Sequence, residues 1–441
     1  MNGHNPAPPS TRPTKDKHAP CPAEAPIAPA RRQQAVTLYL TGEGASLVGT
    51  GVHTVALPVL AVLYLHASPA QAAHLYLLAQ APYLLVSLPA GAIVDRYPIK
   101  TVLIATDLVA AGLVAVIPAA AAFHALTMPV LYTASLLLGA VTVLHQAAAN
   151  VVLVKLADPA LLQQATARQE AVLGASSTIG LYLGSGVLAV TTAARALAVD
   201  SVSYLVSAWC NSRIPALPAP AASARRTTLV TEICDGLRYV LRDPLLRPLA
   251  LCLGVTGAGA GVITAFSAWY LLTIVGVGST GLGVIMGASG AGYLAGALAS
   301  PRLTARFGPG KVLIGSIAVY PLLEIPLLTA RPGGLWPAGL AVAGALQLAA
   351  AACATATVRM VRQRHCPPEL QSRTQQTATW LVAGSRPLAA LGASVLAPAA
   401  GVWATLLAGT LILAGSAFAL WLSPVRHLSH LPDTTPSRSP G

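Results

Sequence analysis

Four polar side chains stand on one long apolar stretch near the start of the chain, and they are its strongest chemical signal: Glu43, Ser46, Thr50 and His53. Their spacing places all four within about 80° of one helix face. Such a stripe faces protein or water rather than lipid. We expect it to form one wall of a cavity, with Glu43 binding a proton or cation and His53 adding a polar contact. The alternative is interhelical hydrogen bonding alone.

Arg386 is a charged side chain in the middle of another apolar stretch, within Gly384-Ser385-Arg386-Pro387. A guanidinium does not usefully deprotonate, and a charge inside an apolar helix costs about 2.5–3.5 kcal/mol. Arg386 therefore needs an acid, a backbone carbonyl or an anionic ligand as its partner. Structural pairing and substrate contact stay open as alternatives.

The composition places these residues in a membrane protein. Hydrophobic residues make up 55% of the 441 and charged residues only 9%, whereas soluble domains carry about 25% charged residues. The net charge of +13 does not indicate nucleic acid, because the basic residues gather in loops and tails. No metal-ligand spacing of cysteines, Walker motif or hydrolase motif occurs. We therefore expect no metal, no cofactor and no enzymatic activity.

Apolar runs divide the chain into twelve expected transmembrane helices, six in residues 36–213 and six in residues 247–422. Residues 1–35 and 423–441 are expected to be disordered tails, and 214–246 a cytoplasmic linker with an amphipathic helix. All but three of the 27 lysines and arginines fall in the tails and the even-to-odd loops; the exceptions are Arg195, Arg331 and Arg386. This bias predicts that both termini are cytoplasmic. The helices are predicted at 36–64, 72–93, 101–122, 126–148, 170–191, 195–213, 247–275, 281–301, 311–330, 335–358, 374–398 and 400–422.

A short charged turn, Gly91–Lys100, joins the second and third of these helices and marks the cytoplasmic membrane surface. Ala90-Gly91-Ala92 recurs as Ala295-Gly296-Ala297, and Lys100 recurs as Lys311. The repeat distance is close to half the chain. It indicates a duplicated helix bundle.

At this turn the chain resembles the major facilitator superfamily, whose loop between helices 2 and 3 reads Gly, three residues, Asp-Arg, one residue, Gly, Arg, Lys. The matching residues are Gly91, Asp95, Arg96 and Lys100. Pro98 and Ile99 depart from the pattern. The resemblance implies two pseudo-symmetric six-helix bundles that rock about a central site. It also implies that the matching residues, together with Asp107, form a gating cluster between the halves.

Residues 36–422 are also similar to a narrower branch of that superfamily, the efflux proteins that include enterobactin and macrolide exporters. The similarity rests on the stretches Gly236–Tyr239, Arg242–Pro244, Val199–Tyr204 and Arg362-Gln363. Antiporters of the superfamily often carry Gly-Pro, two residues, Gly-Gly in helix 5. Here Gly180 and Gly184 keep a spacing that favours close helix packing, but the proline is absent.

The resemblance further implies that helices 1, 4, 7 and 10 line the cavity. Gln146, Asn150 and Trp269 then become candidate substrate contacts. Glu43 becomes a candidate partner for Arg386. Glu324 and Asp200 fall on helices that the family uses as scaffold, so we expect structural roles for them, with a proton role open.

The sequence thus predicts an all-α integral membrane protein of the cell membrane, with twelve transmembrane helices and a monomeric state. We expect it to export a small amphiphilic compound, such as a drug, antibiotic or siderophore, in exchange for protons. Its partners would be the substrate, protons and the lipid bilayer, without nucleic acid. Uptake or lysolipid flipping by the same fold, and a non-transporting membrane sensor, are the alternatives.

Overall fold

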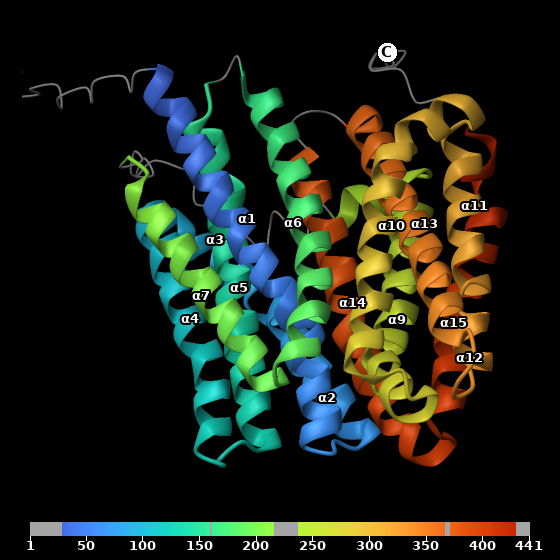
Figure 1. Cartoon of the computed structure of the whole chain (residues 1–441). Coiled ribbons are helices and arrows are strands. Elements are labelled where there is room, and N and C mark those ends of the chain that lie inside the picture. Colours follow the sequence, from blue (N-terminus) through green and yellow to red (C-terminus); the bar gives the residue numbers. More distant parts are fainter. Residues whose placement is uncertain (1–28, 159–160, 216–236, 367–370, 429–441) are drawn as a thin grey trace, which may run out of the picture.

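The computed structural model describes residues 29–158, 161–215, 237–366 and 371–428, which are almost entirely helical (Figure 1). Both predicted tails lie largely outside these residues. Most of the predicted linker, including the start of its amphipathic helix, also lies outside the described residues. The described part of that predicted helix, residues 237–242, is helical.

The first half of the chain passes six times along the bundle. Its second pass is broken into two helices, because Pro89 has no N–H to donate to the carbonyl of Leu85. Ser68 and Gln71 form a capping box that fixes the start of this pass. The elements are α1 (Pro29–Val59), a π-helical turn η1 (Leu60–Tyr64), α2 (Pro69–Leu85), α3 (Ser87–Arg96), α4 (Ile99–Ala122), α5 (Met128–Leu156), α6 (Leu162–Val190) and α7 (Ala193–Arg213).

The second half repeats this plan. Its first pass also ends in a π-helical turn, and its third pass is broken near Glu324, where Pro326 cannot donate to the carbonyl of Leu322. The elements are α9 (Leu246–Tyr270), η3 (Leu271–Val275), α10 (Gly278–Phe307), α11 (Pro309–Leu322), α12 (Ile325–Thr329), α13 (Trp336–His365), α14 (Gln371–Ala400), α15 (Val402–Leu422) and a 3-10 turn η5 (Pro424–His427).

The predicted twelve-helix architecture is confirmed. Ten helices within the described residues are long and apolar enough to cross a membrane. The other two passes are the broken α2–α3 pass and α7, which carries Arg195 and Asp200 inside it. The largest differences from the predicted bounds are at polar ends: α5 runs on to Leu156 and α6 begins at Leu162, because helices extend beyond the hydrocarbon that hydropathy detects.

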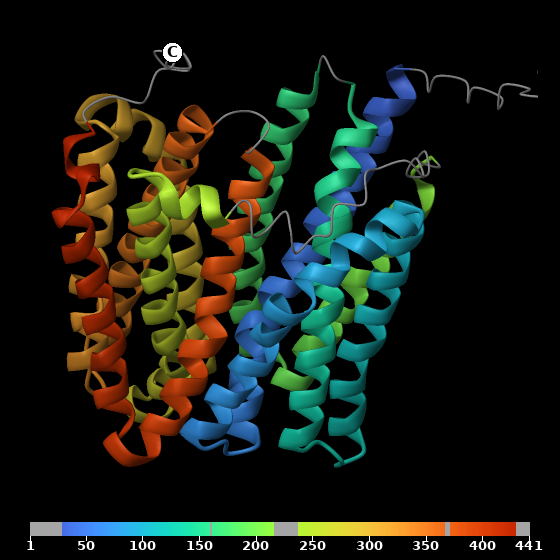
Figure 2. The ribbon, with the colours of Figure 1, turned by 180° about the vertical axis from the view of Figure 1, so that it is seen from behind.

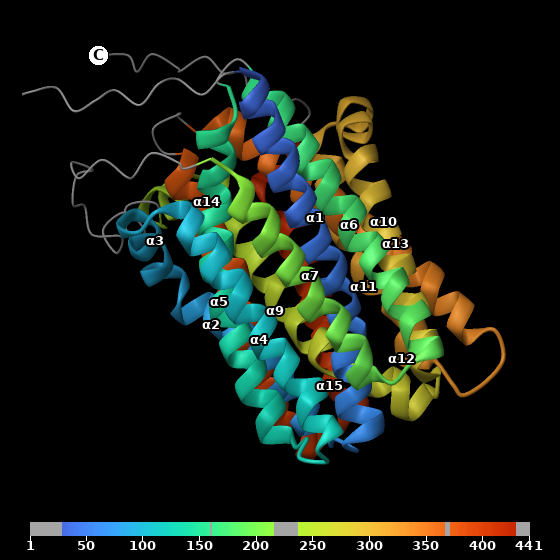
Figure 3. The same cartoon turned by 60° about the vertical axis from the view of Figure 1, so that its left-hand side comes forward.

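The two halves stand side by side, as both faces of the molecule show (Figures 1 and 2). We call the end where α1 begins and α15 ends the tail end, and the opposite end the far end. Between the halves, α6 packs against α10 and α2 packs against α14; the first of these pairs is seen from the side in Figure 3. At the far end η1 contacts η3, so the two π-helical turns meet.

Glycines allow α1 and α6 to touch. A Cβ atom at Gly180 would lie 2.5 Å from the carbonyl oxygen of Val48 and 3.0 Å from Cα of Gly51. At Gly184 it would lie 3.0 Å from Cα of Val52. Backbones this close leave no room for a side chain, so these two positions fix the distance between the helices.

Candidate functional site

A cavity of about 610 Å³ lies between the halves, and we call it the central cavity. Its wall comes from α1, α2 and α5 on one side and from α9, α10, α11 and α13 on the other. Most of the lining is apolar, and its volume suits a drug-sized molecule. The polar and aromatic lining residues include Thr50, His53, Tyr76, Gln80, Tyr83, Thr142, Ser267, Trp269, Tyr320, Glu324 and Gln347.

The predicted stripe on α1 divides between two places. Thr50 and His53 line the central cavity. His53 Nδ1 lies 2.9 Å from Oδ2 of Asp200 on α7, and Thr50 Oγ1 lies 3.4 Å from the hydroxyl of Tyr204. Asp200 is buried, and although its Oδ2 and His53 Nδ1 lie within ion-pair distance, neither atom makes a hydrogen bond within the described residues. Ser46 is buried too, outside the cavity lining.

Glu43 belongs to a separate cluster nearer the tail end. Its Oε2 lies 3.3 Å from Nε2 of His145 on α5, and Nδ1 of the same ring lies 3.3 Å from Oδ1 of Asp107 on α4. Ser207 Oγ and Asn211 Nδ2, both on α7, donate to Asp107 Oδ2 at 2.8 and 2.9 Å. One histidine is thus bracketed by two carboxylates from different helices.

This cluster corrects the predicted grouping of Asp107 with the charged turn. Asp107 is 1% exposed and contacts α5 and α7. Lys100 instead donates from Nζ to the carbonyl of Ile214 at 2.6 Å, and Arg96 is exposed. Seven residues separate positions 100 and 107, so Asp107 lies about 10 Å deeper along α4. The side chain of Asp95 lies outside the described atoms, and Gly91 lies within α3.

Arg386 is not paired with Glu43, whose contact is His145. Arg386 is on α14, and its main chain lies against Gly261 of α9, where a Cβ atom would be 2.7 Å from the Arg386 carbonyl oxygen. Its Nε is buried and makes no hydrogen bond within the described residues.

Of the other three predicted substrate contacts, one lines the central cavity and two do not. Trp269 lines the cavity and donates from Nε1 to the carbonyl of Ala67 at 3.0 Å. Gln146 stands outside the lining but donates to the hydroxyl of Tyr83, which is part of it, at 3.3 Å. Asn150 is exposed, nearer the tail end of α5.

Sequence reasoning missed the contribution of α2 and underrated Glu324. The side chains of Tyr76, Gln80 and Tyr83 line the cavity from α2. Glu324, expected to be structural, also lines it and accepts a hydrogen bond from Gln347 Nε2. Its position beside Pro326 could have indicated this in the sequence. A proline breaks the helix, and a broken helix inside a membrane protein is tolerated where it is buried in protein or lines a cavity.

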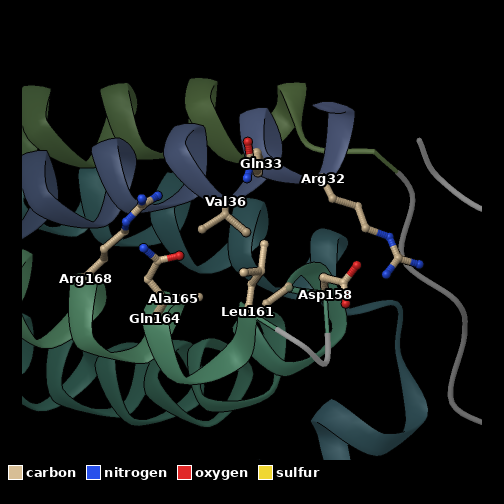
Figure 4. Close-up of a pocket in the computed structure, with 9 residues that line it drawn as sticks. Arg32, Gln33, Val36, Asp158, Leu161, Gln164, Ala165 and Arg168 are labelled. Carbon is tan, nitrogen blue, oxygen red and sulfur yellow. The ribbon is translucent and has the colours of Figure 1, made fainter. Parts of the chain in front are cut away.

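A second, much smaller hollow lies at the tail end between α1 and the start of α6, with Arg32 and Arg168 near its two ends (Figure 4). Its volume is about 60 Å³. That is room for only a few water molecules. We therefore take the central cavity, and not this hollow, as the candidate substrate site.

Comparison with known sequences identifies the family. A family model described as transmembrane secretion effector matches residues 24–439. The uncharacterized MFS-type transporter y4rN of Sinorhizobium fredii is 26% identical over 383 residues, covering 86% of this chain and 90% of that protein. The uncharacterized MFS-type transporter YfiS of Bacillus subtilis is 24% identical over 219 residues, about half of each chain.

Solved structures share the fold at low identity. The nucleoside transporter NupG has a TM-score of 0.69, with 12% identity over 89% of this chain and 99% of that one. A bacterial homologue of the human lysosomal transporter Spinster has a TM-score of 0.65, with 14% identity over 90% of this chain and 98% of that one. The chain therefore belongs to the transmembrane secretion effector family of the major facilitator superfamily, and it is a multi-pass membrane transporter.

Proposed function

We propose that this protein exports a small amphiphilic compound in exchange for protons, by alternating access between its two halves. The observation that carries the proposal is the central cavity, which is walled by both halves and combines an apolar lining with a few convergent polar groups. Such a lining suits a molecule with an apolar body and one polar or charged end. A site between two bundles is also the place that rocking of one bundle against the other exposes to either side.

The lining favours a cationic end on that molecule. Glu324 is the one carboxylate among the described lining residues, and they include no lysine or arginine. The rings of Tyr76, Tyr320 and Trp269 offer faces for cation–π contact. We therefore expect the cation near Glu324.

Contacts between the halves support a state in which the far end is closed. The hydrogen bond from Trp269 to Ala67 and the contact of η1 with η3 both join the halves there. At the tail end Arg359 of α13 and Glu170 of α6 lie 3.5 Å apart, with more than half of each side chain exposed. An exposed pair of this kind contributes little to stability. Under the predicted topology the tail end is cytoplasmic, so substrate would arrive from that side.

Transport by purified protein in proteoliposomes tests the proposal, with ethidium as a cationic amphiphilic probe. We expect a pH gradient to drive ethidium against the direction of proton flow, and a protonophore to abolish that movement. Counterflow with ethidium in both orientations separates export from uptake. Movement of labelled lysophosphatidylcholine without movement of ethidium would support lipid flipping and contradict the proposal.

A further inference from the structure

The cluster around His145 is a built site that the substrate cavity does not use. Its side chains are Glu43 from α1, Asp107 from α4 and His145 from α5, and we call these three the acid–histidine cluster. The side chains of Glu43 and His145 are 13% and 14% exposed, whereas Asp107 is 1% exposed. The cluster therefore has an outer member that solvent can reach and an inner member that it cannot.

Thr106 sets the proton positions on the imidazole. Its one hydroxyl hydrogen is shared between the main-chain carbonyls of Val102 and Leu103, which lie 2.8 and 2.9 Å from Oγ1. The lone pairs of the same hydroxyl, 3.1 Å from His145 Nδ1, are left to accept. We therefore assign the hydrogen of the neutral ring to Nδ1, which leaves Nε2, opposite Glu43, as the nitrogen that gains or loses a proton.

Asp107 offers one free acceptor to this ring. Its Oδ2 is held by Ser207 and Asn211. Its Oδ1 is buried, makes no hydrogen bond within the described residues, and lies 3.3 Å from His145 Nδ1. A buried acceptor without a hydrogen bond is costly. A small shift of the ring, or a proton on Oδ1, removes that cost.

The charges of the cluster also favour binding of a proton. With both carboxylates ionised and His145 neutral, the three groups carry two net negative charges inside the helix bundle. A charge at this depth is unfavourable unless it is compensated. Binding of one proton halves this net negative charge. The other titratable side chains that face it are Tyr39 from α1 and Tyr204 and Cys210 from α7.

We propose that the acid–histidine cluster is the proton-binding relay of this transporter. A proton from water first binds Glu43 Oε2. Glu43 passes it to His145 Nε2. A small shift of the ring turns Nδ1–H from Thr106 towards Asp107, and the ring then releases that proton to Asp107 Oδ1. One N–H bond and one O–H bond form as one O–H bond and one N–H bond break, and the ring ends as the other neutral tautomer. The reverse sequence returns the proton to water.

The relay is joined to the central cavity through α1. Glu43 and His53 stand on one face of that helix, ten residues or about 15 Å apart. His53 lines the cavity. Protonation that loosens the contact between α1 and α5 therefore changes the position of a cavity wall without competing directly with the substrate. This link to transport rests on the proposed function above; proton binding by the cluster does not.

Infrared difference spectroscopy of the protein in lipid, titrated between about pH 5 and about pH 9, tests proton binding without any substrate. We expect the carbonyl band of a protonated carboxyl group to titrate in this range. Asp107→Asn should remove the inner carboxyl's part of the band, and His145→Gln should move its midpoint by about one pH unit or more. Glu170→Gln, which removes an exposed carboxylate, serves as the matched control. Identical titrations in wild type, Asp107→Asn and His145→Gln would overturn the relay.

Transport by the same variants tests the link to the cavity. We expect His145→Gln and Asp107→Asn to reduce ethidium movement driven by a pH gradient by about tenfold or more, the effect of one pKa unit of coupling. Ethidium counterflow needs no net proton movement. Its rate in both variants should therefore stay within about twofold of the wild-type rate. Loss of both would make the cluster a substrate or folding site and overturn its assignment as the relay. If Asp107→Asn does not fold, His145→Gln and Glu43→Gln carry the test.

If the wild-type protein moves no ethidium at all, the proposed function fails while the infrared titration still decides on proton binding. The two failures are therefore distinguishable.

Discussion

The indole Nε1 of Trp269 donates a hydrogen bond of 3.0 Å to the main-chain carbonyl of Ala67, and this bond joins the two halves of the chain at the far end of the bundle. Ala67 follows η1 and Trp269 precedes η3. The contact therefore lies where the two π-helical turns meet, at the edge of the central cavity that Trp269 also lines.

Trp269→Phe should weaken the closure of the far end. Loss of one hydrogen bond costs about 0.5–1.5 kcal/mol, which lowers the ratio of closed to open molecules by a factor of about 2 to 13. The measurement is the distance between spin labels at positions 66 and 277. Trp403→Phe is the matched control, because Trp403 Nε1 donates to the carbonyl of Leu328 at 2.9 Å within the second half. Equal distance distributions for wild type and Trp269→Phe would contradict this account of the closure.

Glu43→Gln should abolish proton-coupled efflux while the protein is still expressed. The amide can hydrogen-bond to His145 but cannot exchange a proton at the relevant pH. The measurement is proton movement into proteoliposomes, followed by a pH-sensitive dye in the lumen as ethidium leaves. Unchanged proton movement would remove Glu43 from the mechanism.

Glu324→Gln should weaken ethidium binding. A hydrogen bond or contact to a charged group is worth about 1.5–3 kcal/mol, so we expect the Kd to rise about tenfold or more. Equilibrium binding followed by ethidium fluorescence measures this, with Glu170→Gln as the control. An unchanged Kd would show that the cation is bound elsewhere in the cavity.

Gly180→Ala should destabilise the packing of α1 on α6. The added methyl group would lie 2.5 Å from the Val48 carbonyl oxygen. Overpacking of this kind costs about 1–3 kcal/mol. Thermal unfolding in detergent measures it, and Gly186→Ala on the same helix is the control, because its Cβ atom would meet nothing within 4 Å. A melting temperature as high as that of the control would argue against tight packing here.

Asp243→Asn should lower stability in a pH-dependent way. Partial burial opposes ionisation of Asp243, but hydrogen bonds from the Leu246 N–H, from His365 and from the Leu245 N–H outweigh it and hold the pKa of the carboxyl below its usual value. A carboxyl with a lowered pKa adds stability that is present above its unfolded value and is lost as the pH falls through its folded value.

The melting temperature of Asp243→Asn should therefore fall below that of wild type at pH 7. The difference should shrink as the pH drops below about 4, where the unfolded carboxyl is protonated. Thermal melts at a series of pH values give the result. A difference that stays constant with pH would assign the effect to packing instead of charge.

The helices and their number could be predicted because a bilayer imposes them. A pass must be apolar over its length, and basic residues such as Arg96 and Lys100 mark a loop at a membrane surface. The glycine spacing at 180 and 184 likewise marks a face that can approach a neighbouring helix. These are properties of single segments, and a sequence shows them directly.

The partners of each polar side chain could not be predicted in the same way. The sequence groups Glu43 with the cavity-lining His53 on one helix face, but the contact of Glu43 is His145, which comes from a helix about one hundred residues further on. Asp107 shares a face with Lys100, yet two helical turns separate the membrane surface from the interior. Which helices pack together depends on the whole bundle, and periodicity within one helix carries no information about it.

The paired π-helical turns η1 and η3 make the two halves mutually dependent at the far end. A π-helical turn holds one residue more than the α-helical turn it replaces, so it rotates everything after it by about 100°. Both halves carry this offset at the same place, and the carbonyl of Ala67 and the indole of Trp269 meet beside it. Deleting a single residue from either turn would rotate the loop that follows it relative to the corresponding loop of the other half. The contact between Ala67 and Trp269 could then form only after a matching deletion in the other turn.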